Sequence, residues 1–354
     1  MPSVLVNIIS RDEIISKINH LAIAAKPFLF AVDFEGDHGF VLTPGEAENH
    51  GILYDFEGIT NGKIQPAIHP RKFEISPVSF PTYRKAFDHV IHHLHRGDTY
   101  LINLTFPTPI VTDRTPEELF FASHAPFKLY VPGQFVVFSP EIFVRIQGHT
   151  ISSFPMKGTI DAATPDAGKR LMENEKEFFE HNTIVDLIRN DLSMVSTNVT
   201  VKRFRYLELI KTNRDDLWQM SSAINGKLPD CYLKNLGEIL FTLLPVGSVT
   251  GAPKEKTVQI IRETETYQRG FYTGIFGYFN GHSLSSAVLI RYVELNKENI
   301  RIIRFETEDG RNPIPDFTNE YPVMVFKSGG GITALSDAES EYREMIQKVY
   351  VPLV

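Results

Sequence analysis

The amino-acid sequence predicts an α+β protein with large antiparallel β-sheets and helices outside them. Short segments with the β-branched and aromatic composition of strands recur along all 354 residues. Segments with helical periodicity lie between them, but the two kinds do not alternate regularly, so a doubly wound parallel sheet is not indicated. No low-complexity linker or internal repeat marks a boundary, and we therefore expect residues 1–354 to form a single unit.

The expected strands are short and are bounded by Gly, Asn, Asp or Pro. They cover residues 28–32, 135–138, 143–146, 285–293 and 300–305. The expected helices have apolar residues at every third or fourth position. They cover residues 83–95, 167–192, 231–243, 254–265 and 336–350. Residues 40–81 are rich in turn formers, so we expect an irregular surface region there.

Composition excludes several classes of protein. A formal net charge of −7 argues against a nucleic-acid binder, which normally has a basic face. The N-terminus lacks the basic region and cleavage site of a signal peptide, and no apolar stretch is long enough to span a bilayer. Cys231 is the only cysteine, so an intrachain disulfide is impossible. These features favour a cytoplasmic protein that binds neither nucleic acid nor membrane.

Three glycine-bearing stretches in the C-terminal half are candidates for binding an anion. Residues 247–254 form a glycine-rich turn that leads into a helical pattern, where free backbone N–H groups and hydroxyls are available. Residues 269–278 and Gly329, Gly330 and Gly331 are further places where backbone can approach a ligand closely. Each stretch taken alone also fits a plain turn or hairpin.

Four glutamates are candidate ligands for a hard cation. Glu177 and Glu180 lie three positions apart in one helical pattern, and Glu341 and Glu344 do so in another, so each pair shares a helix face. Carboxylates without clustered His or Cys favour Mg²⁺ over zinc. The alternative is that both pairs are solvated helix faces.

Lys157 and Glu141 are candidate catalytic residues. Lys157 lies among Phe, Pro and Met in a turn-like segment after an expected strand, and partial desolvation there would lower its pKa and free its amine for nucleophilic attack. Glu141 precedes the adjoining strand and is positioned to donate a proton into the same site. On local context alone, both residues also fit ordinary surface positions.

Taken together, the motifs resemble those of the chorismate-binding enzyme family, from about Tyr83 to the C-terminus. The family includes anthranilate, aminodeoxychorismate, isochorismate and salicylate synthases. The matching segments occur in the family's order, and residues 184–192 are the most specific. They are residues 97–100, 139–141, 155–159, 180–181, 184–192, 247–254, 269–278, 329–331 and 341–344, with Arg291 and Lys348.

The resemblance implies two large packed antiparallel sheets with helices outside, and a shortened, less certain N-terminal part of the same fold over residues 1–82. It implies that Glu180 and Glu341 bind Mg²⁺ directly, with Glu177 and Glu344 around the ion or bound through water. The metal would hold the ring carboxylate of chorismate. The residues that would bind the enolpyruvyl carboxylate or line its pocket are Arg291, Tyr272, Lys348, Gly329, Gly330, Gly331, Ser248 and Thr250.

Lys157 decides the branch within the family. Enzymes similar to aminodeoxychorismate synthase component I carry Lys in this motif, whereas the other branches carry Ala. The resemblance then implies attack of Lys157 on C2 of chorismate, loss of the 4-hydroxyl as water after protonation by Glu141, and addition of ammonia at C4. The product would be 4-amino-4-deoxychorismate, a precursor of para-aminobenzoate and folate. It also implies a separate glutamine amidotransferase subunit as the ammonia source.

Leu101 departs from the family pattern, because ammonia-using members usually have Gln there and water-using members usually have Lys. Leucine is no base for water, which argues against isochorismate or salicylate synthesis. Gln219 stands where His is common. Two alternatives stay open: anthranilate synthase component I, and a catalytically inert chorismate-binding protein.

Overall fold

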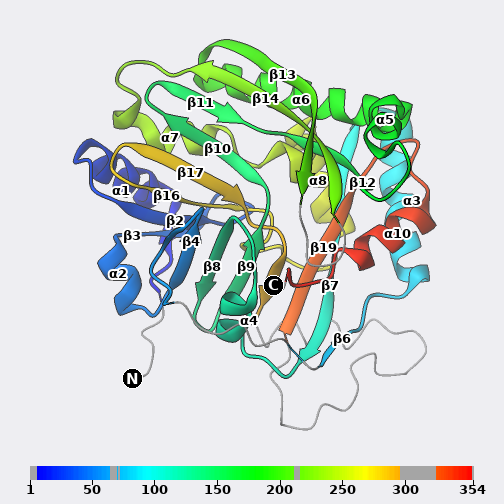
Figure 1. Cartoon of the computed structure of the whole chain (residues 1–354), viewed down its shortest axis with the longest axis horizontal. Coiled ribbons are helices and arrows are strands. Elements are labelled where there is room, and N and C mark those ends of the chain that lie inside the picture. The colour runs from blue at the N-terminus through cyan, green and yellow to red at the C-terminus, as the bar shows by residue number, and fades with distance from the viewer. Residues whose placement is uncertain (1–5, 64–69, 71, 211–215, 296–323, 353–354) are drawn as a thin grey trace.

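Two antiparallel β-sheets pack face to face in the computed structural model, and helices cover their outer faces (Figure 1). The structure describes residues 6–63, 70, 72–210, 216–295 and 324–352. This architecture confirms the predicted fold class, α+β with two large packed antiparallel sheets and helices outside.

The larger sheet has ten strands in the order β1-β3-β2-β16-β17-β10-β11-β14-β12, with β13 paired to β14. These strands are β1 (Ile9–Ser10), β2 (Phe28–Val32), β3 (His38–Leu42), β10 (Ile142–Gln147), β11 (Thr150–Ser153), β12 (Met156–Asp161), β13 (Thr197–Ile210), β14 (Leu217–Lys227), β16 (Ile275–Phe279) and β17 (Ser283–Val288). Every residue of strand β2 is buried. Since alternate side chains of a strand point to opposite sides, both faces of β2 are covered. Phe28 and Phe30 contact the helix side, and Leu29 and Ala31 contact the second sheet.

The second sheet has nine strands in the order β15-β7-β19-β18-β9-β8-β4-β5, with β6 paired to β7. These strands are β4 (Leu53–Phe56), β5 (Ile59–Thr60), β6 (Phe73–Ile75), β7 (Leu101–Thr112), β8 (Phe127–Val131), β9 (Phe135–Ser139), β15 (Gly251–Ala252), β18 (Tyr292–Glu294) and β19 (Met324–Ile332). Strand β19 pairs with β7 along its whole length.

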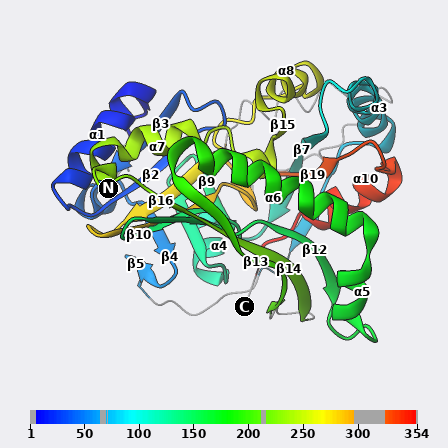
Figure 2. The ribbon, with the colours of Figure 1, turned by 90° about the horizontal axis from the view of Figure 1, so that it is seen from above.

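The described helices fall into two main groups. Helices α1, α6 and α7 pack on the ten-stranded sheet, and α3, α8 and α10 pack on the β7–β19 part of the nine-stranded sheet (Figure 2). The helices are α1 (Arg11–Ile23), α2 (Pro44–Asn49), α3 (Phe80–Arg96), α4 (Pro116–Ala122), α5 (Ala167–Glu173), α6 (Glu175–Val195), α7 (Leu236–Thr242), α8 (Lys254–Thr264) and α10 (Ala338–Gln347), with 3₁₀-helices η1 (Tyr232–Asn235) and η2 (Gly247–Val249).

The single strand predicted over residues 285–293 is wrong, because the chain changes sheets there. Strand β17 belongs to the ten-stranded sheet and β18 to the nine-stranded sheet, and residues 289–291 connect them. Arg291 takes a left-handed conformation with φ +54°. A residue other than glycine in that region is held there by its surroundings. The crossing places Arg291 at the junction of the two sheets.

Other predicted elements are confirmed or corrected by local features. The strands at 28–32, 135–138 and 143–146 and the helices at 83–95, 254–265 and 336–350 are present within a few residues. The helix predicted over 167–192 is two helices, because extended Asn174 ends α5 and caps α6 by accepting a hydrogen bond from Glu177 N at 3.1 Å. The helix predicted over 231–243 begins as the 3₁₀-helix η1.

The irregular region predicted over residues 40–81 is wrong where the structure has regular elements. It contains α2, β4, β5 and β6. In the nine-stranded sheet, β4 pairs with β5 and β8, and β6 pairs with β7. The rings of buried Tyr54 and Phe56 pack against Tyr278 of the ten-stranded sheet. The sequence did not indicate this packing, because turn-forming residues surround both aromatic residues. The predicted strand at 300–305 lies outside the described residues.

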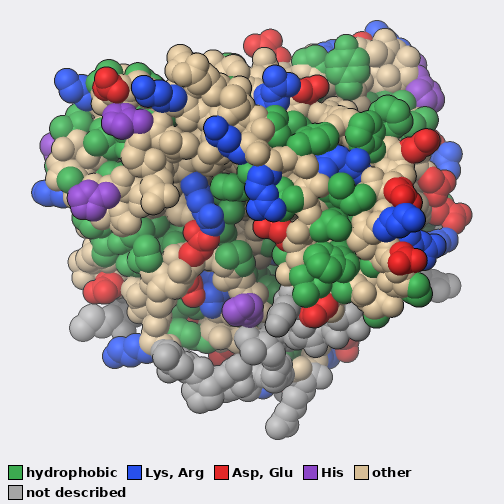
Figure 3. All heavy atoms as spheres, turned by 45° about the horizontal axis from the view of Figure 1, so that its top comes forward, with side chains coloured by type: hydrophobic (Ala, Val, Ile, Leu, Met, Phe, Trp, Pro, Cys, Tyr) green, Lys and Arg blue, Asp and Glu red, His purple; other side chains and the backbone are tan. Residues whose placement is uncertain are grey.

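Charged and apolar side chains are interspersed on the face shown in Figure 3, which carries no continuous basic surface. Among the described helices, none combines the length and apolar character needed to cross a bilayer.

Candidate active site

Lys157 lies in strand β12, not in the turn that the sequence predicted. Its pairing with β14 is interrupted by a register shift between Met156 and Thr159, and Gly158 inside this bulge has φ +81°. A Cβ added to Gly158 would lie 2.8 Å from Glu177 Oε2, so only glycine fits beside the carboxylate. Bulges re-aim neighbouring side chains. This one places Lys157 next to helix α6.

The ammonium of Lys157 is held by carboxylates. Its Nζ lies 2.8 Å from Glu180 Oε2. Burial alone would lower the pKa of Lys157, but the charge and hydrogen bond of Glu180, with Glu344 and Glu177 further out, outweigh burial and raise the pKa. The predicted lowering of the pKa is therefore wrong for this arrangement. Glu180 must leave the ammonium before the lysine becomes a nucleophile.

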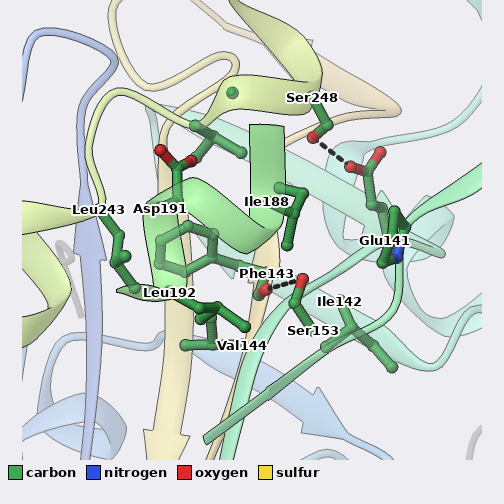
Figure 4. Close-up of a pocket in the computed structure, with 13 residues that line it drawn as sticks. Glu141, Ile142, Phe143, Val144, Ser153, Ile188, Asp191, Leu192, Leu243 and Ser248 are labelled. Carbon is green, nitrogen blue, oxygen red and sulfur yellow. Dashed lines mark hydrogen bonds between the residues drawn. The ribbon is translucent and has the colours of Figure 1, made fainter. Parts of the chain in front are cut away.

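Glu141 is held at the start of β10 by a short hydrogen bond. Ser248 Oγ donates to Glu141 Oε1 at 2.6 Å, and Figure 4 shows the two side chains pointing toward one another. Burial raises the pKa of Glu141, although Ser248 and the positive charges of Lys348, Arg291 and Lys157 act in the opposite direction. A carboxyl group with a raised pKa that faces three cations is suited to deliver a proton to a leaving group.

A mainly apolar cavity lies beside Glu141, between β10, α6 and residues 243–248 (Figure 4). Asp191 lines it and forms an ion pair with Lys254 at 2.9 Å, and Lys254 Nζ also donates to Leu243 O at 2.8 Å. This pair ties α6 to the start of α8 and so supports the turn that carries Ser248. Sequence reasoning assigned it no role, because the partners lie far apart in the chain.

The three glycines lie near the C-terminal end of strand β19, opposite residues 103–105 of β7. A Cβ added to Gly330 would lie 3.5 Å from Glu341 Oε2 and 3.7 Å from Lys348 Nζ. One added to Gly331 would lie 3.8 Å from Lys157 Nζ. Because they carry no side chains, the glycines leave a bare strip of strand beside Lys157, where a ligand can approach the backbone closely.

Two of the predicted carboxylate-binding residues contact this strip or each other. Lys348 Nζ donates to Gly329 O at 3.0 Å, and Arg291 Nη1 donates to Lys348 O at 3.1 Å. Burial lowers the pKa of Lys348, although Glu344 Oε1 lies 2.7 Å from its Nζ. Tyr272 is buried, which raises its pKa, and it lies within the electrostatic reach of Arg291 and Glu141. The structure thus brings these residues together around Glu141.

Thr250 offers an oxygen without a partner. It is fully buried, and its Oγ1 has no hydrogen-bond partner among the residues that the structure describes. A buried hydroxyl in that state is costly unless a ligand or water satisfies it. Its backbone is fixed, because Thr250 O accepts from Asn103 N at 2.9 Å and Asn103 Nδ2 donates to Val249 O at 3.0 Å.

A buried ion pair, missed from the sequence, supports the same turn. The side chains of Arg269 and Glu265 are 2% and 1% exposed. Arg269 Nη1 donates to Val249 O at 3.0 Å and its Nη2 donates to Asn103 O at 2.6 Å. The sequence indicated Arg269 only as part of the motif at residues 269–278. It did not indicate that the side chain is buried, since charged residues are usually exposed.

The four glutamates lie on two helices that flank Lys157, Glu177 and Glu180 on α6 and Glu341 and Glu344 on α10. Glu341 is 5% exposed and accepts from Ser336 Oγ at 2.8 Å. A set of oxygen donors without His or Cys fits Mg²⁺. No three of them bring their ligand atoms within 4.8 Å of one another in the described chain, and the Lys157 ammonium lies among them instead.

Residues 46–306 match the family model described as chorismate binding enzyme. An uncharacterized PabA-like protein of Haemophilus influenzae is 43% identical over 339 residues, which cover 96% of each chain. Aminodeoxychorismate synthase component 1 of Bacillus subtilis is 28% identical over 231 residues, covering 62% of this chain and 48% of that protein.

Among solved structures, MenF, the menaquinone-specific isochorismate synthase from Escherichia coli, superposes with a TM-score of 0.69. The superposition covers 97% of this chain and 82% of that chain at 17% identity, so it bears on the fold alone. The family match includes strands of both sheets, together with Glu141, Lys157, Ser248 and Arg291. The chain belongs to the chorismate-binding enzyme family.

Proposed function

We propose that the protein converts chorismate and ammonia to 4-amino-4-deoxychorismate, the reaction of aminodeoxychorismate synthase component I. The observation that carries the proposal is the position of Lys157. Its Nζ lies beside the bare strand at Gly331 and within the electrostatic reach of Glu141, which has the raised pKa of a proton donor. A nucleophile and an acid that face one site permit covalent catalysis.

Chorismate carries two carboxylates, and the site offers two kinds of group for them. Arg291, Lys348 and the backbone of the glycine strip are placed to bind the enolpyruvyl carboxylate, with Thr250 Oγ1 as a further donor. Guanidinium and ammonium groups give the strong, charge-assisted hydrogen bonds that a carboxylate requires. This arrangement orients the ring toward Lys157.

Glu180 and Glu341 would hold Mg²⁺, with Glu177 and Glu344 around it, consistent with their oxygen-only donor set. When bound, the ion neutralises the charge of the ring carboxylate. With the Glu180 carboxylate engaged there, Lys157 loses the ion pair that raises its pKa, and burial then favours the free amine.

The proposed reaction has two chemical steps. The Lys157 amine forms a bond to C2, both ring double bonds shift, and the C4–O bond breaks as Glu141 gives its proton to the departing hydroxyl, which leaves as water. Ammonia then forms a bond to C4, the double bonds shift back, and the bond between C2 and the lysine nitrogen breaks. The enolpyruvyl group is retained. Two allylic substitutions thereby replace one direct substitution.

The proposed ammonia source is a separate glutamine amidotransferase subunit. Cys231, the only cysteine, is exposed just before η1 and forms no hydrogen bond with a His or an acidic side chain of the described residues that would activate it, so we assign glutamine hydrolysis to another chain. Ammonium salts should support turnover by this chain alone, and glutamine should not.

Leu101 strengthens the choice of ammonia over water. Leu101 is 6% exposed, and its Cδ1 lies 3.2 Å from the position of a Cβ on Gly331, on the same strip as Lys157. An apolar wall there offers no base to activate water. Release of isochorismate is therefore not expected.

Incubation with chorismate, Mg²⁺ and ammonium at alkaline pH, followed by mass spectrometry, tests the reaction. The expected product is 4-amino-4-deoxychorismate without pyruvate. Pyruvate together with fluorescent anthranilate would overturn the assignment in favour of anthranilate synthase. Absence of turnover under all conditions would favour an inert chorismate-binding protein.

The covalent step has its own test. Without ammonia, the intact protein should gain the mass of chorismate less one water. Lys157→Ala should abolish this adduct, whereas Lys169→Ala, which changes a lysine 71% exposed on α5, should retain it. Persistence of the adduct in Lys157→Ala would show that another group attacks.

A further inference from the structure

A second cluster of potential metal ligands lies away from the active site, on helices α3 and α8. His89 and His93 of α3 and Glu263 of α8 bring their ligand atoms within 4.8 Å of one another. Within the described part of the chain, no other group of three or more His, Cys, Asp or Glu side chains lies this close. Figure 2 shows the two helices side by side at the edge of the molecule.

The two histidines share a face of α3 because they lie one helical turn apart. Their ring centroids are 4.9 Å apart, and the rings are nearly perpendicular at 78°. His93 is 9% exposed, whereas His89 and Glu263 are exposed and can adjust to a ligand. The cluster therefore combines one fixed donor with two adaptable ones.

Two of the three donors also form hydrogen bonds with neighbouring side chains. His93 Nδ1 lies 2.7 Å from Asp98 Oδ2, which leaves Nε2 as the ring nitrogen available to a metal ion. This hydrogen bond also lowers the pKa of Asp98, so the carboxylate stays ionised. Gln259 Nε2 donates to Glu263 Oε1 at 2.7 Å. A carboxylate on the far nitrogen of a ligating histidine is a recurrent feature of metal sites in proteins.

We propose that His89, His93 and Glu263 bind a Zn²⁺-class divalent transition metal ion that clamps α3 to α8. Two imidazoles and a carboxylate suit Zn²⁺, which keeps a water as its fourth ligand. Bonds of about 2.0–2.1 Å at tetrahedral angles place ligand atoms roughly 3.4 Å apart. Side-chain rotation of exposed His89 and Glu263 closes the remaining gap.

The clamp would act on segments that lead to the active site. The chain runs from α3 into β7, where Leu101 and Ile102 pair with β15, and β15 leads directly into α8. A metal ion that joins α3 to α8 would hold β7 and β15 together, and β15 follows directly on the turn that carries Ser248. A metal ion that binds the native state and not the unfolded chain stabilises the native state by mass action.

The experiment is calorimetric titration of the protein, prepared without a polyhistidine tag, with Zn²⁺ alone. Glu180→Gln and Glu341→Gln are introduced first, so that the active-site carboxylates do not contribute. We expect one saturable site and a raised melting temperature. In this background, His89→Ala and Glu263→Gln should each weaken Zn²⁺ binding at least about tenfold.

Matched controls keep the proposal falsifiable. His92→Ala changes an exposed histidine on α3, and Glu255→Gln changes an exposed glutamate on α8, and neither should alter the affinity. With Co²⁺ in place of Zn²⁺, visible absorption bands should appear and be lost in His89→Ala. No saturable binding, or equal losses in the controls, would overturn the proposal.

Discussion

Replacing Arg269 by methionine should destabilise the protein by about 3–5 kcal/mol, because breaking a buried ion pair leaves an uncompensated charge. The Arg269 guanidinium donates two hydrogen bonds to the Glu265 carboxylate, from Nη2 to Oε1 at 2.7 Å and from Nε to Oε2 at 2.9 Å. Methionine fills part of the space but donates no hydrogen bond. The carbonyls of Val249 and Asn103 also lose a donor, at about 1 kcal/mol each.

Urea unfolding, followed by circular dichroism and by the fluorescence of Trp218, the single tryptophan, measures this change. Arg343→Met is the control, since its side chain is 71% exposed in a surface pair with Glu339, and it should change stability by less than about 1 kcal/mol. Adding Glu265→Gln to Arg269→Met removes the stranded charge and should recover about 2 kcal/mol or more. A loss below about 1 kcal/mol in Arg269→Met, or no recovery in the double variant, would refute the reasoning.

Three further predictions concern the pH dependence of stability and the glycine strip. Burial, with the charges of Arg205 and Lys157, lowers the pKa of His181 from 6.5 to about 4, so the unfolded chain binds a proton more readily than the folded one. Stability should be full above pH 6.5 and fall by roughly 3 kcal/mol as the pH drops to about 4. His181→Gln should flatten this slope in urea titrations, and an unchanged slope would contradict the assignment. In the strip, a Cβ on Gly329 would lie 2.3 Å from the Leu104 carbonyl oxygen, so Gly329→Ala should lower stability by about 2 kcal/mol. Gly330→Ala meets only ordinary contacts and should keep the melting temperature but raise KM for chorismate about tenfold or more; an unchanged KM would show that the substrate does not approach there.

Local pattern was sufficient for the fold class and for many elements. Strand β2 at Phe28–Val32 and helix α8 are found where the sequence predicts them, because burial and periodicity within a few residues specify each. The order of the motifs indicated the family, and the structure brings five of the predicted site residues near Glu141: Lys157, Ser248, Tyr272, Arg291 and Lys348. These patterns are contained in short segments, so they can be recognised without knowledge of the tertiary structure.

Long-range contacts decided the rest. The chain crosses between sheets at residues 289–291, although the sequence there reads as one continuous strand. The ion pairs of Asp191 with Lys254 and of Lys157 with Glu180 join positions 63 and 23 residues apart. No local rule of spacing reports such contacts.

Lys157 combines both kinds of information. Its residue type and its motif, which the sequence alone provides, identify it as a candidate nucleophile. Its place in a strand bulge and its carboxylate partner, which raises the pKa of the amine, depend on how β12 and α6 pack. A pKa is set by the charges and solvent around a group in space, so only the tertiary structure determines the state of that lysine.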